Sequence, residues 1–256
     1  MFENIAVETK GPIGQIRLAR PEKLNPLSTA TLQELARAAR LFDEHRDVKI
    51  VVVRGEGRAF SAGADLSSFA ERQALSPRDA GDVGREMADA LESMRALSIA
   101  AIRGWCVGGG LVVAAACDLR IASENARFSI PEVDLGIPLA WGGIPRLVRE
   151  IGPALTKELV LTCRSFDAQE ARAVGFLNRV VPDDALDASV DELAESLAKK
   201  AGLTIFATKR HVNAVTDQMV GTMRSWSDAD GLANALQDPE CADARRAYLE
   251  ARRQRS

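Results

Sequence analysis

Short hydrophobic runs, some alternating with polar residues and some continuous, follow one another along the first half of the chain. Apolar and polar positions alternate over residues 5–18 around glycine-containing turns, which predicts a β-hairpin or two short strands. Further apolar runs predict strands that are largely buried, and they lie at 49–53, 98–102, 119–122 and 126–129. The first half of the chain is therefore expected to be rich in short strands.

Helical periodicity separates these strands. Apolar residues at helical spacing form one face over residues 32–42, where Thr31 and Glu34 have the spacing of a capping box. A second helical stripe covers residues 83–94. Strands and helices thus alternate to about residue 130 in units of strand, strand and helix. Repeated crossings of this kind predict stacked sheets rather than a hairpin sandwich.

The second half of the chain is mainly helical. After a short predicted strand at 179–181, helical patterns continue to the end. The predicted helices cover 144–151, 153–162, 167–174, 186–200, 205–215, 219–236 and 239–253. We expect an α/β core over residues 1–195 and a helical region over residues 196–256 that packs on the core or on a neighbouring subunit.

One stretch combines glycines with small apolar residues, namely WCVGGGLVVAAACD at residues 105–118. Glycines have no Cβ to shield their N–H groups, and the residues after them predict a buried helix. The first N–H groups and positive dipole end of such a helix suit an oxyanion or a phosphate. A tight turn that serves only packing explains the same residues. The dinucleotide fingerprint GxGxxG and the phosphate-loop pattern are both missing.

Composition narrows the class of protein. The chain has 256 residues, 46% hydrophobic and 27% charged, which allows a sizeable core, and its net charge of −3 gives no basic excess for nucleic acid. The four scattered cysteines lack zinc-site spacing and predict free thiols in a reducing compartment. The sequence shows no signal peptide and no membrane-length apolar run, so we expect a cytoplasmic enzyme.

The carboxylates offer more chemistry than the histidines. The chain has only His45 and His211 and no GxSxG sequence, which argues against a Ser-His-Asp hydrolase. Glu132 lies in the apolar sequence FSIPEVDLGIP at residues 128–138. Apolar surroundings disfavour an ionised carboxylate and raise its pKa toward the range that is useful for proton transfer. A structural role, as a cap or an arginine partner, is the alternative for Glu132.

Several of these segments together resemble one family. They are FSAGADL at 60–66, WCVGGG at 105–110, CDLRIA at 117–122, FSIPEVDLG at 128–136, GGIPRL at 142–147 and AQEARAVGFLNRVV at 168–181. In this order and spacing they are similar to the crotonase family, also called the enoyl-CoA hydratase/isomerase superfamily. The resemblance implies an α/β, crotonase-like spiral of ββα units with a helical C-terminal trimerisation region, often assembled as a dimer of trimers. It also implies an acyl-CoA thioester as ligand, with no cofactor other than the CoA of the substrate.

The resemblance also assigns roles to individual residues. The N–H groups of Ala64 and Gly109 match the family's oxyanion hole, and Glu132 matches a glutamate that transfers protons. Residues that match the positions of CoA or substrate contacts are Lys23, Leu24, Ala62, Gly63, Asp65, Leu66, Trp105, Gly108, Trp141, Tyr248 and Arg252. For Lys23, Tyr248 and Arg252, a solvated surface position explains the residue equally well.

Two departures from the family pattern bear on the reaction. Family hydratases carry a first glutamate where this chain has Val112, and valine cannot ionise. A single glutamate, Glu132, fits Δ3–Δ2-enoyl-CoA isomerisation better than hydration, because one carboxylate can remove a proton from C2 and return it at C4. The alternatives are a 2-enoyl-CoA hydratase and a non-catalytic acyl-CoA-binding protein. Trp141 replaces a small residue and either narrows or redirects the acyl pocket or fills a gap in the core.

Overall fold

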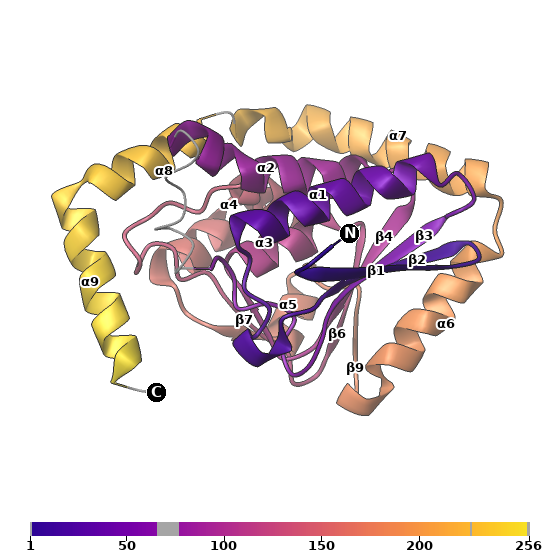
Figure 1. Ribbon diagram of the computed structural model, residues 1–256, viewed down its shortest axis with the longest axis horizontal. Coiled ribbons are helices and arrows are strands. Elements are labelled where there is room, and N and C mark those ends of the chain that lie inside the picture. Colours follow the sequence, from indigo (N-terminus) through magenta and orange to yellow (C-terminus); the bar gives the residue numbers. More distant parts are fainter. Residues whose placement is uncertain (1, 66–76, 226, 255–256) are drawn as a thin grey trace.

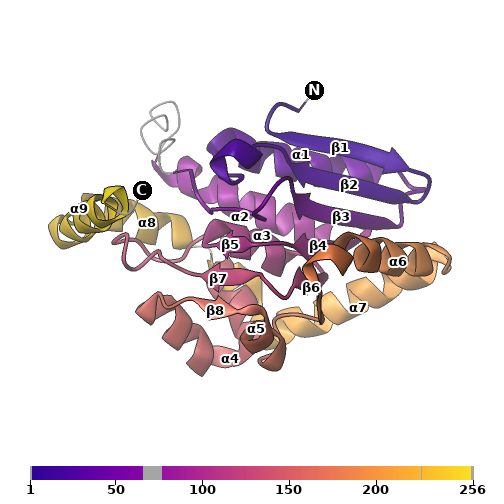
Figure 2. The ribbon, with the colours of Figure 1, turned by 90° about the horizontal axis from the view of Figure 1, so that it is seen from below.

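The computed structural model describes residues 2–65, 77–225 and 227–254, and these residues form two sheets surrounded by helices (Figures 1 and 2). The larger sheet has the strand order β1 (Ile5–Lys10), β2 (Ile13–Leu18), β3 (Ile50–Gly55), β4 (Leu97–Ile102), β6 (Leu119–Ser123) and β9 (Arg179–Val181). The smaller sheet has the order β5 (Trp105–Val107), β7 (Arg127–Ser129) and β8 (Phe166–Asp167). The predicted alternation of strands and helices is confirmed.

Helices surround the two sheets. They are α1 (Thr29–Glu44), α2 (Pro77–Ser93), α3 (Gly109–Ala116), α4 (Gly143–Thr162), α5 (Ala168–Ala173), α6 (Leu186–Ala198), α7 (Gly202–Val220), α8 (Asp228–Gln237) and α9 (Pro239–Arg253). Short 3₁₀ turns occur at η1 (Pro21–Lys23), η4 (Asp183–Ala185) and η5 (Thr222–Ser225). Figure 1 shows α9, in yellow, at the edge of the molecule away from α6.

The large sheet has a separate core on each face. β1 and β2 form an antiparallel hairpin, which is one of the two alternatives predicted for residues 5–18, and the pairs from β2 to β9 are parallel. Side chains of β3 alternate, so Val51 and Val53 pack in the core that includes α1, α2 and α3. Ile50 and Val52 pack with α6 on the other face. Helices therefore cover both faces, which explains why β3 is a continuous apolar run.

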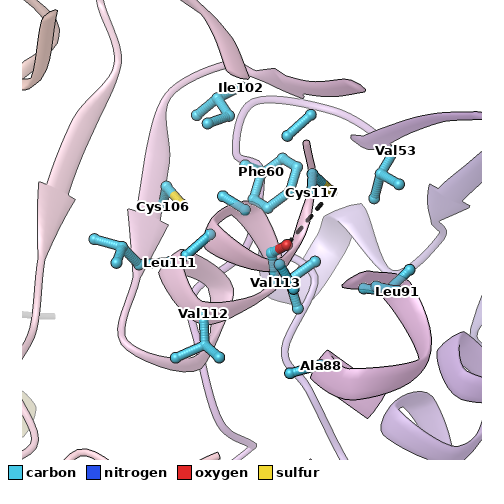
Figure 3. Close-up of a cluster of buried hydrophobic side chains, with 14 of the residues drawn as sticks. Val53, Phe60, Ala88, Leu91, Ile102, Cys106, Leu111, Val112, Val113 and Cys117 are labelled. Carbon is cyan, nitrogen blue, oxygen red and sulfur yellow. Dashed lines mark hydrogen bonds between the residues drawn. The ribbon is translucent and has the colours of Figure 1, made fainter. Parts of the chain in front are cut away.

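Helix α3 is buried along its whole length (Figure 3). Its residues are small or apolar, and they pack in the same core as side chains of β3, β4 and α2. At its C-terminal end, the guanidinium of Arg120 donates hydrogen bonds to the carbonyl oxygens of Cys117 (2.8 Å) and Ala114 (3.4 Å). This cation satisfies carbonyls that the helix leaves unpaired and complements the negative end of its dipole. The C-terminal end of α3 is thereby fixed in the core.

Some local predictions were wrong or incomplete. Ser28, not Thr31, caps α1 by accepting a hydrogen bond from the N–H of Thr31. The carboxylate of Glu34 instead accepts the backbone N–H groups of Glu3 and Asn4, both at 2.9 Å, and so fixes the N-terminal segment. Spacing alone indicated a capping box because it does not reveal which residue has the extended backbone of a cap.

The helical half also differs from prediction in detail. The expected single helix over 219–236 is wrong, since α7 ends at Val220 and α8 begins at Asp228. The helices expected at 144–151 and 153–162 are two arms of α4, which bends at Gly152 (φ 76°) before Pro153. The short strands β5 and β8 were not predicted as strands, because two or three residues carry too little periodicity.

The C-terminal helices pack back onto the first half of the chain. A Cβ on Gly81 of α2 would lie 2.8 Å from the Cβ of Ala229, so the missing side chain lets α8 approach α2 closely. The expected domain boundary after residue 195 falls inside α6, which packs on the large sheet. Within the described residues, no helix is both long and apolar enough to cross a membrane.

Candidate functional site

Two loops meet at the N-terminal end of α3. The N–H of Ser61 donates to the carbonyl of Trp105 (3.0 Å), and the N–H of Val107 donates to the carbonyl of Ser61 (3.0 Å). This pairing extends to Gly63, where an added Cβ would lie 2.7 Å from the carbonyl oxygen of Val107 and 3.6 Å from the nitrogen of Gly109. The loop that follows β3 therefore lies against the glycine turn that begins α3.

At this junction the backbone N–H groups of Ala64, Gly109 and Gly110 have no hydrogen-bond acceptor among the described residues. Leu27 pairs with the residues on either side of Ala64, since it donates to Gly63 (2.8 Å) and accepts from Asp65 (3.0 Å). In such a parallel bridge the N–H of Ala64 points the other way. Gly109 is the first residue of α3, so its N–H has no helical partner. Free N–H donors at a helix N-terminus, such as those of Ala64 and Gly109, suit a developing oxyanion.

Each of the three consecutive glycines leaves room for a different neighbour. A Cβ on Gly108, whose φ is +49°, would lie 2.2 Å from Oε1 of Glu132. A Cβ on Gly109 would lie 2.2 Å from the indole of Trp141, and one on Gly110 would lie 2.7 Å from the Cβ of Ser61. The glycine turn therefore does serve packing. Two of the three neighbours are candidate site residues, so its packing also holds the site together.

Glu132 lies in the turn that follows β7, with its carboxylate against Gly108. Its side chain is only 9% exposed, and burial raises its pKa from 4.5 to about 7. Within the described residues its Oε2 has no hydrogen-bond partner, and Glu132 forms no ion pair. The direction of this pKa change is the one that the sequence predicts. The arginine partner of the alternative explanation is not found among the described residues.

This buried carboxyl is expected to make stability depend on pH. The folded state keeps the Glu132 proton up to about pH 7, whereas the unfolded chain releases it near 4.5, so the folded state binds more protons between these values. The free energy of unfolding should therefore fall by about 3 kcal/mol from pH 4.5 to above 7, relative to Glu132→Gln. Urea unfolding of both proteins at several pH values measures this difference. An equal pH dependence of the two proteins would contradict it.

Two adjoining cavities share Ala64, Glu132 and Ile137. The inner cavity is about 30 Å³, and its walls include Gly109 and a group of apolar side chains, Val112, Leu139, Trp141 and Leu232. The outer channel is about 300 Å³ and leads to the surface past the C-terminal helix α9. In the part of the chain that the structure describes, Glu132 is the only ionisable side chain lining the inner cavity. A reacting group in the inner cavity would thus meet one carboxyl in apolar surroundings.

Most of the residues expected at the site border these two cavities. The inner one contains Ala64, Gly109, Glu132 and Trp141, and the outer one contains Leu24, Ala62, Gly63, Trp105, Gly108, Tyr248 and Arg252. Lys23 is exposed and lines neither cavity, and Asp65 forms an ion pair with Arg20 at 3.3 Å instead. Leu66 lies outside the described residues.

One wall of the inner cavity and the residues behind another wall carry no signal in the sequence. Leu232 of α8 lines the cavity although it lies 100 positions after Glu132. Arg146 and Asp228 support the turn at Trp141 from behind. Leu232 has the pattern of an ordinary core position, so no local signal distinguishes it. The described residues contain no group of three or more His, Cys, Asp or Glu side chains that could hold a metal ion.

Comparisons with known proteins match nearly the whole chain to members of one family. The model of the family described as Enoyl-CoA hydratase/isomerase matches residues 8–255. The Short-chain-enoyl-CoA hydratase of Clostridium acetobutylicum is 33% identical over 254 residues, which cover 98% of this chain and 97% of the relative. The peroxisomal Delta(3,5)-Delta(2,4)-dienoyl-CoA isomerase of Arabidopsis thaliana is 32% identical and covers 93% and 91%. A crystal structure of an enoyl-CoA hydratase/isomerase from Xanthobacter autotrophicus Py2 matches with a TM-score of 0.85 and 29% identity, over 99% and 94% of the chains.

Proposed function

The chain belongs to the enoyl-CoA hydratase/isomerase family and is an enzyme of the lyase/isomerase kind with a crotonase-like fold, and from this premise we propose that it isomerises Δ3-enoyl-CoA to Δ2-enoyl-CoA thioesters. One observation carries the choice of reaction. Among the described residues, Glu132 is the only ionisable side chain lining the inner cavity, and the position of the family's other glutamate is occupied by Val112 in the same cavity. A reaction that needs one proton carrier fits this site better than one that needs two.

In this proposal the thioester oxygen of the substrate accepts hydrogen bonds from the N–H groups of Ala64 and Gly109. The carboxylate of Glu132 then takes a proton from C2. The electron pair of that C–H bond forms a C1–C2 double bond, and negative charge moves to the thioester oxygen. Each of the two donors is expected to contribute a factor of about 10²–10³ to the rate, because both are fixed before charge develops.

The second step returns the same proton to a different carbon. Protonated Glu132 gives its proton to C4 of the dienolate. The π pair of the C3–C4 double bond forms the new C4–H bond, the π pair of the C1–C2 double bond forms the C2–C3 double bond, and the enolate oxygen returns its charge to re-form the thioester carbonyl. Loss of its proton leaves Glu132 as the carboxylate again. A pKa of about 7 suits a group that must accept and donate at neutral pH. The chemistry needs one carboxylate and two N–H groups, so it calls for no cofactor beyond the CoA of the substrate.

The outer channel is the proposed path of the pantetheine arm. Its walls include Gly108 of the glycine turn, Leu24 and Trp105, together with Tyr248 and Arg252 of α9. The guanidinium of Arg252 offers a positive charge for the phosphates of CoA. A channel with apolar side chains and a cation in its wall supports an acyl-CoA thioester as the substrate class.

Hydration of a 2-enoyl-CoA is the second candidate, and the name of the relative from Clostridium acetobutylicum favours it. Hydration needs a water that is activated at C3 as well as a proton delivered at C2. Val112 is fully buried at the relevant wall and offers no acceptor for that water. The site is therefore poorer for hydration than for proton transfer between two carbons.

The substrate preference of the protein tests this choice. We expect the wild type to convert 3-hexenoyl-CoA to the conjugated 2-enoyl thioester, followed by its ultraviolet absorbance, and to hydrate 2-hexenoyl-CoA at least about 10²-fold more slowly. Val112→Glu should raise the hydration rate, whereas Val112→Gln, of similar size but unable to ionise, should not. Faster hydration than isomerisation by the wild type would overturn the assignment.

We also propose that the protein assembles as a homotrimer or a dimer of trimers. Two surface hollows of about 500 and 730 Å³ border α7, and Glu132 lines neither of them. The same helix exposes large apolar side chains, among them Leu203, Val212 and Met219. Such a surface is typical of a subunit interface, and sedimentation of the purified protein measures the assembly.

A further inference from the structure

Trp141 has a backbone conformation that few tryptophans adopt. Its φ is +61°, in the left-handed region that disfavours a bulky side chain, yet its side chain is only 6% exposed. Such strained residues persist only where their surroundings fix them, and they concentrate at functional sites. The turn at Trp141 therefore needs an explanation beyond filling the core.

The surrounding residues fix this turn from two directions. Arg146, which is fully buried, donates hydrogen bonds to the carbonyl oxygens of Gly142 (3.2 Å) and Trp141 (3.4 Å) and forms ion pairs with Asp89 and Glu92. From α8, the carboxylate of Asp228 accepts the N–H of Gly142 at 2.8 Å. Arg146 of α4, which is paired with carboxylates of α2, and Asp228 of α8 thus hold the backbone that carries the indole.

Two glycines give the indole its space. A Cβ on Gly84 of α2 would lie 2.2 Å from the indole carbons Cδ1 and Cγ, and a Cβ on Gly109 would lie 2.2 Å from Cζ3. The ring is therefore held between the middle of α2 and the first residue of α3. The N–H of that first residue is the proposed donor to the thioester oxygen, so the indole stands directly beside the reacting end of the substrate.

We propose that Trp141 is the wall that restricts this enzyme to short acyl chains. The inner cavity of about 30 Å³ has room for only a few non-hydrogen atoms beyond the thioester. Trp141 closes it together with Leu139 and Leu232, and its ring has the largest volume of the three. The indole cannot retreat, because Gly84 is already in contact behind it. A longer chain has no place unless the ring is removed.

The proposal rests on the acyl-CoA assignment above, and binding tests it without turnover. The dissociation constants of butanoyl-CoA and octanoyl-CoA, both saturated, are measured by calorimetry for the wild type and for Trp141→Ala. Each methylene that becomes buried is worth about fourfold in affinity. We expect the wild type to bind octanoyl-CoA no more tightly than butanoyl-CoA. The substitution should improve the ratio in favour of octanoyl-CoA by at least about tenfold.

Further variants separate a steric wall from a structural residue. Trp141→Leu, which keeps an apolar side chain, should shift the ratio in the same direction by less, and it replaces Trp141→Ala should that variant fail to fold. Gly84→Leu in the Trp141→Ala background returns bulk from the opposite wall and should restore the preference for the short chain. Trp105→Ala is the matched control, because Trp105 lines only the outer channel and should change both affinities by the same factor.

Two results would overturn the proposal, and they differ from failure of the proposed reaction. An unchanged affinity ratio in both Trp141 variants, or tighter binding of octanoyl-CoA by the wild type, would make Trp141 a core residue only. The same protein could then still isomerise 3-enoyl thioesters. If the wild type bound neither acyl-CoA, the assignment of an acyl-CoA substrate would itself fail. The role proposed for Trp141 would then fail as well.

Discussion

Glu132→Gln is expected to lower kcat/KM for 3-enoyl-CoA isomerisation by about 10³–10⁴-fold, the upper part of the range for loss of a general base. Glutamine has nearly the shape of glutamate but can neither take the proton from C2 nor return it at C4. Its neutral amide removes a buried charge, so the variant should fold at least as well as the wild type. Steady-state rates with 3-hexenoyl-CoA measure the loss.

The pH profile of the wild type should identify the same group. Burial raises the pKa of Glu132 to about 7, and the proposed first step needs its ionised form. We therefore expect kcat/KM to rise with pH up to about 7 and to level off above it. Substitution by glutamine should abolish this rise together with most of the activity.

Binding provides the control for the glutamine variant. Butanoyl-CoA should bind to Glu132→Gln with an affinity close to that of the wild type, because the N–H donors and the channel are unchanged. Loss of binding together with activity would indicate a structural role for Glu132. Retention of full isomerase activity would remove Glu132 from the mechanism.

Gly109→Ala is expected to lower kcat/KM by about 10²-fold, although it adds only one methyl group. Its Cβ would lie 2.2 Å from Cζ3 and 2.8 Å from Cη2 of Trp141, whose other edge is already against Gly84. Since the ring cannot yield, the first turn of α3 must move, and the N–H of residue 109 leaves its place. Misplacing one oxyanion donor typically costs about this much in rate. Overpacking should also destabilise the fold by about 1–3 kcal/mol.

Two variants show whether the indole is the cause. Gly202→Ala adds the same methyl group at the start of α7, where its nearest neighbours lie at an ordinary 3.5 Å, and should leave the rate unchanged. In the double variant Gly109→Ala/Trp141→Gly the clash is removed, so the rate should recover in part; such non-additivity is expected of residues in contact. An active Gly109→Ala protein would place the oxyanion donors elsewhere. Kinetics and thermal unfolding of the four proteins decide the point.

The sequence predicted those parts of the fold that depend on local pattern. β3 and α3 are long enough and apolar enough for their burial to be read directly, and both are buried as expected. Glu132 was recognisable because apolar residues and prolines surround it in the chain itself, and its pKa is raised by that burial. Local pattern could not predict a strand as short as β8, nor that Ser28 is the residue that caps α1.

The order of motifs was the other information that the sequence contained. Segments at 60–66, 105–110 and 128–136 indicated the family together, whereas the glycine triplet alone left packing and anion binding open. The resemblance to the family also showed that Val112 stands where family hydratases have a glutamate. These inferences depend on residue identity and spacing, which folding leaves unchanged.

Only the tertiary structure decided what each residue faces. From the sequence, Trp141 could either border an acyl pocket or fill a gap in the core. Packing between Gly84 and Gly109 puts its ring at the inner cavity. Leu232 lines the same cavity from α8. Gly108, which has no side chain, leaves room for the carboxylate of Glu132. The physical reason is that these contacts join residues many positions apart. Their geometry is set by how the helices pack on the sheets, which no stretch of sequence contains by itself.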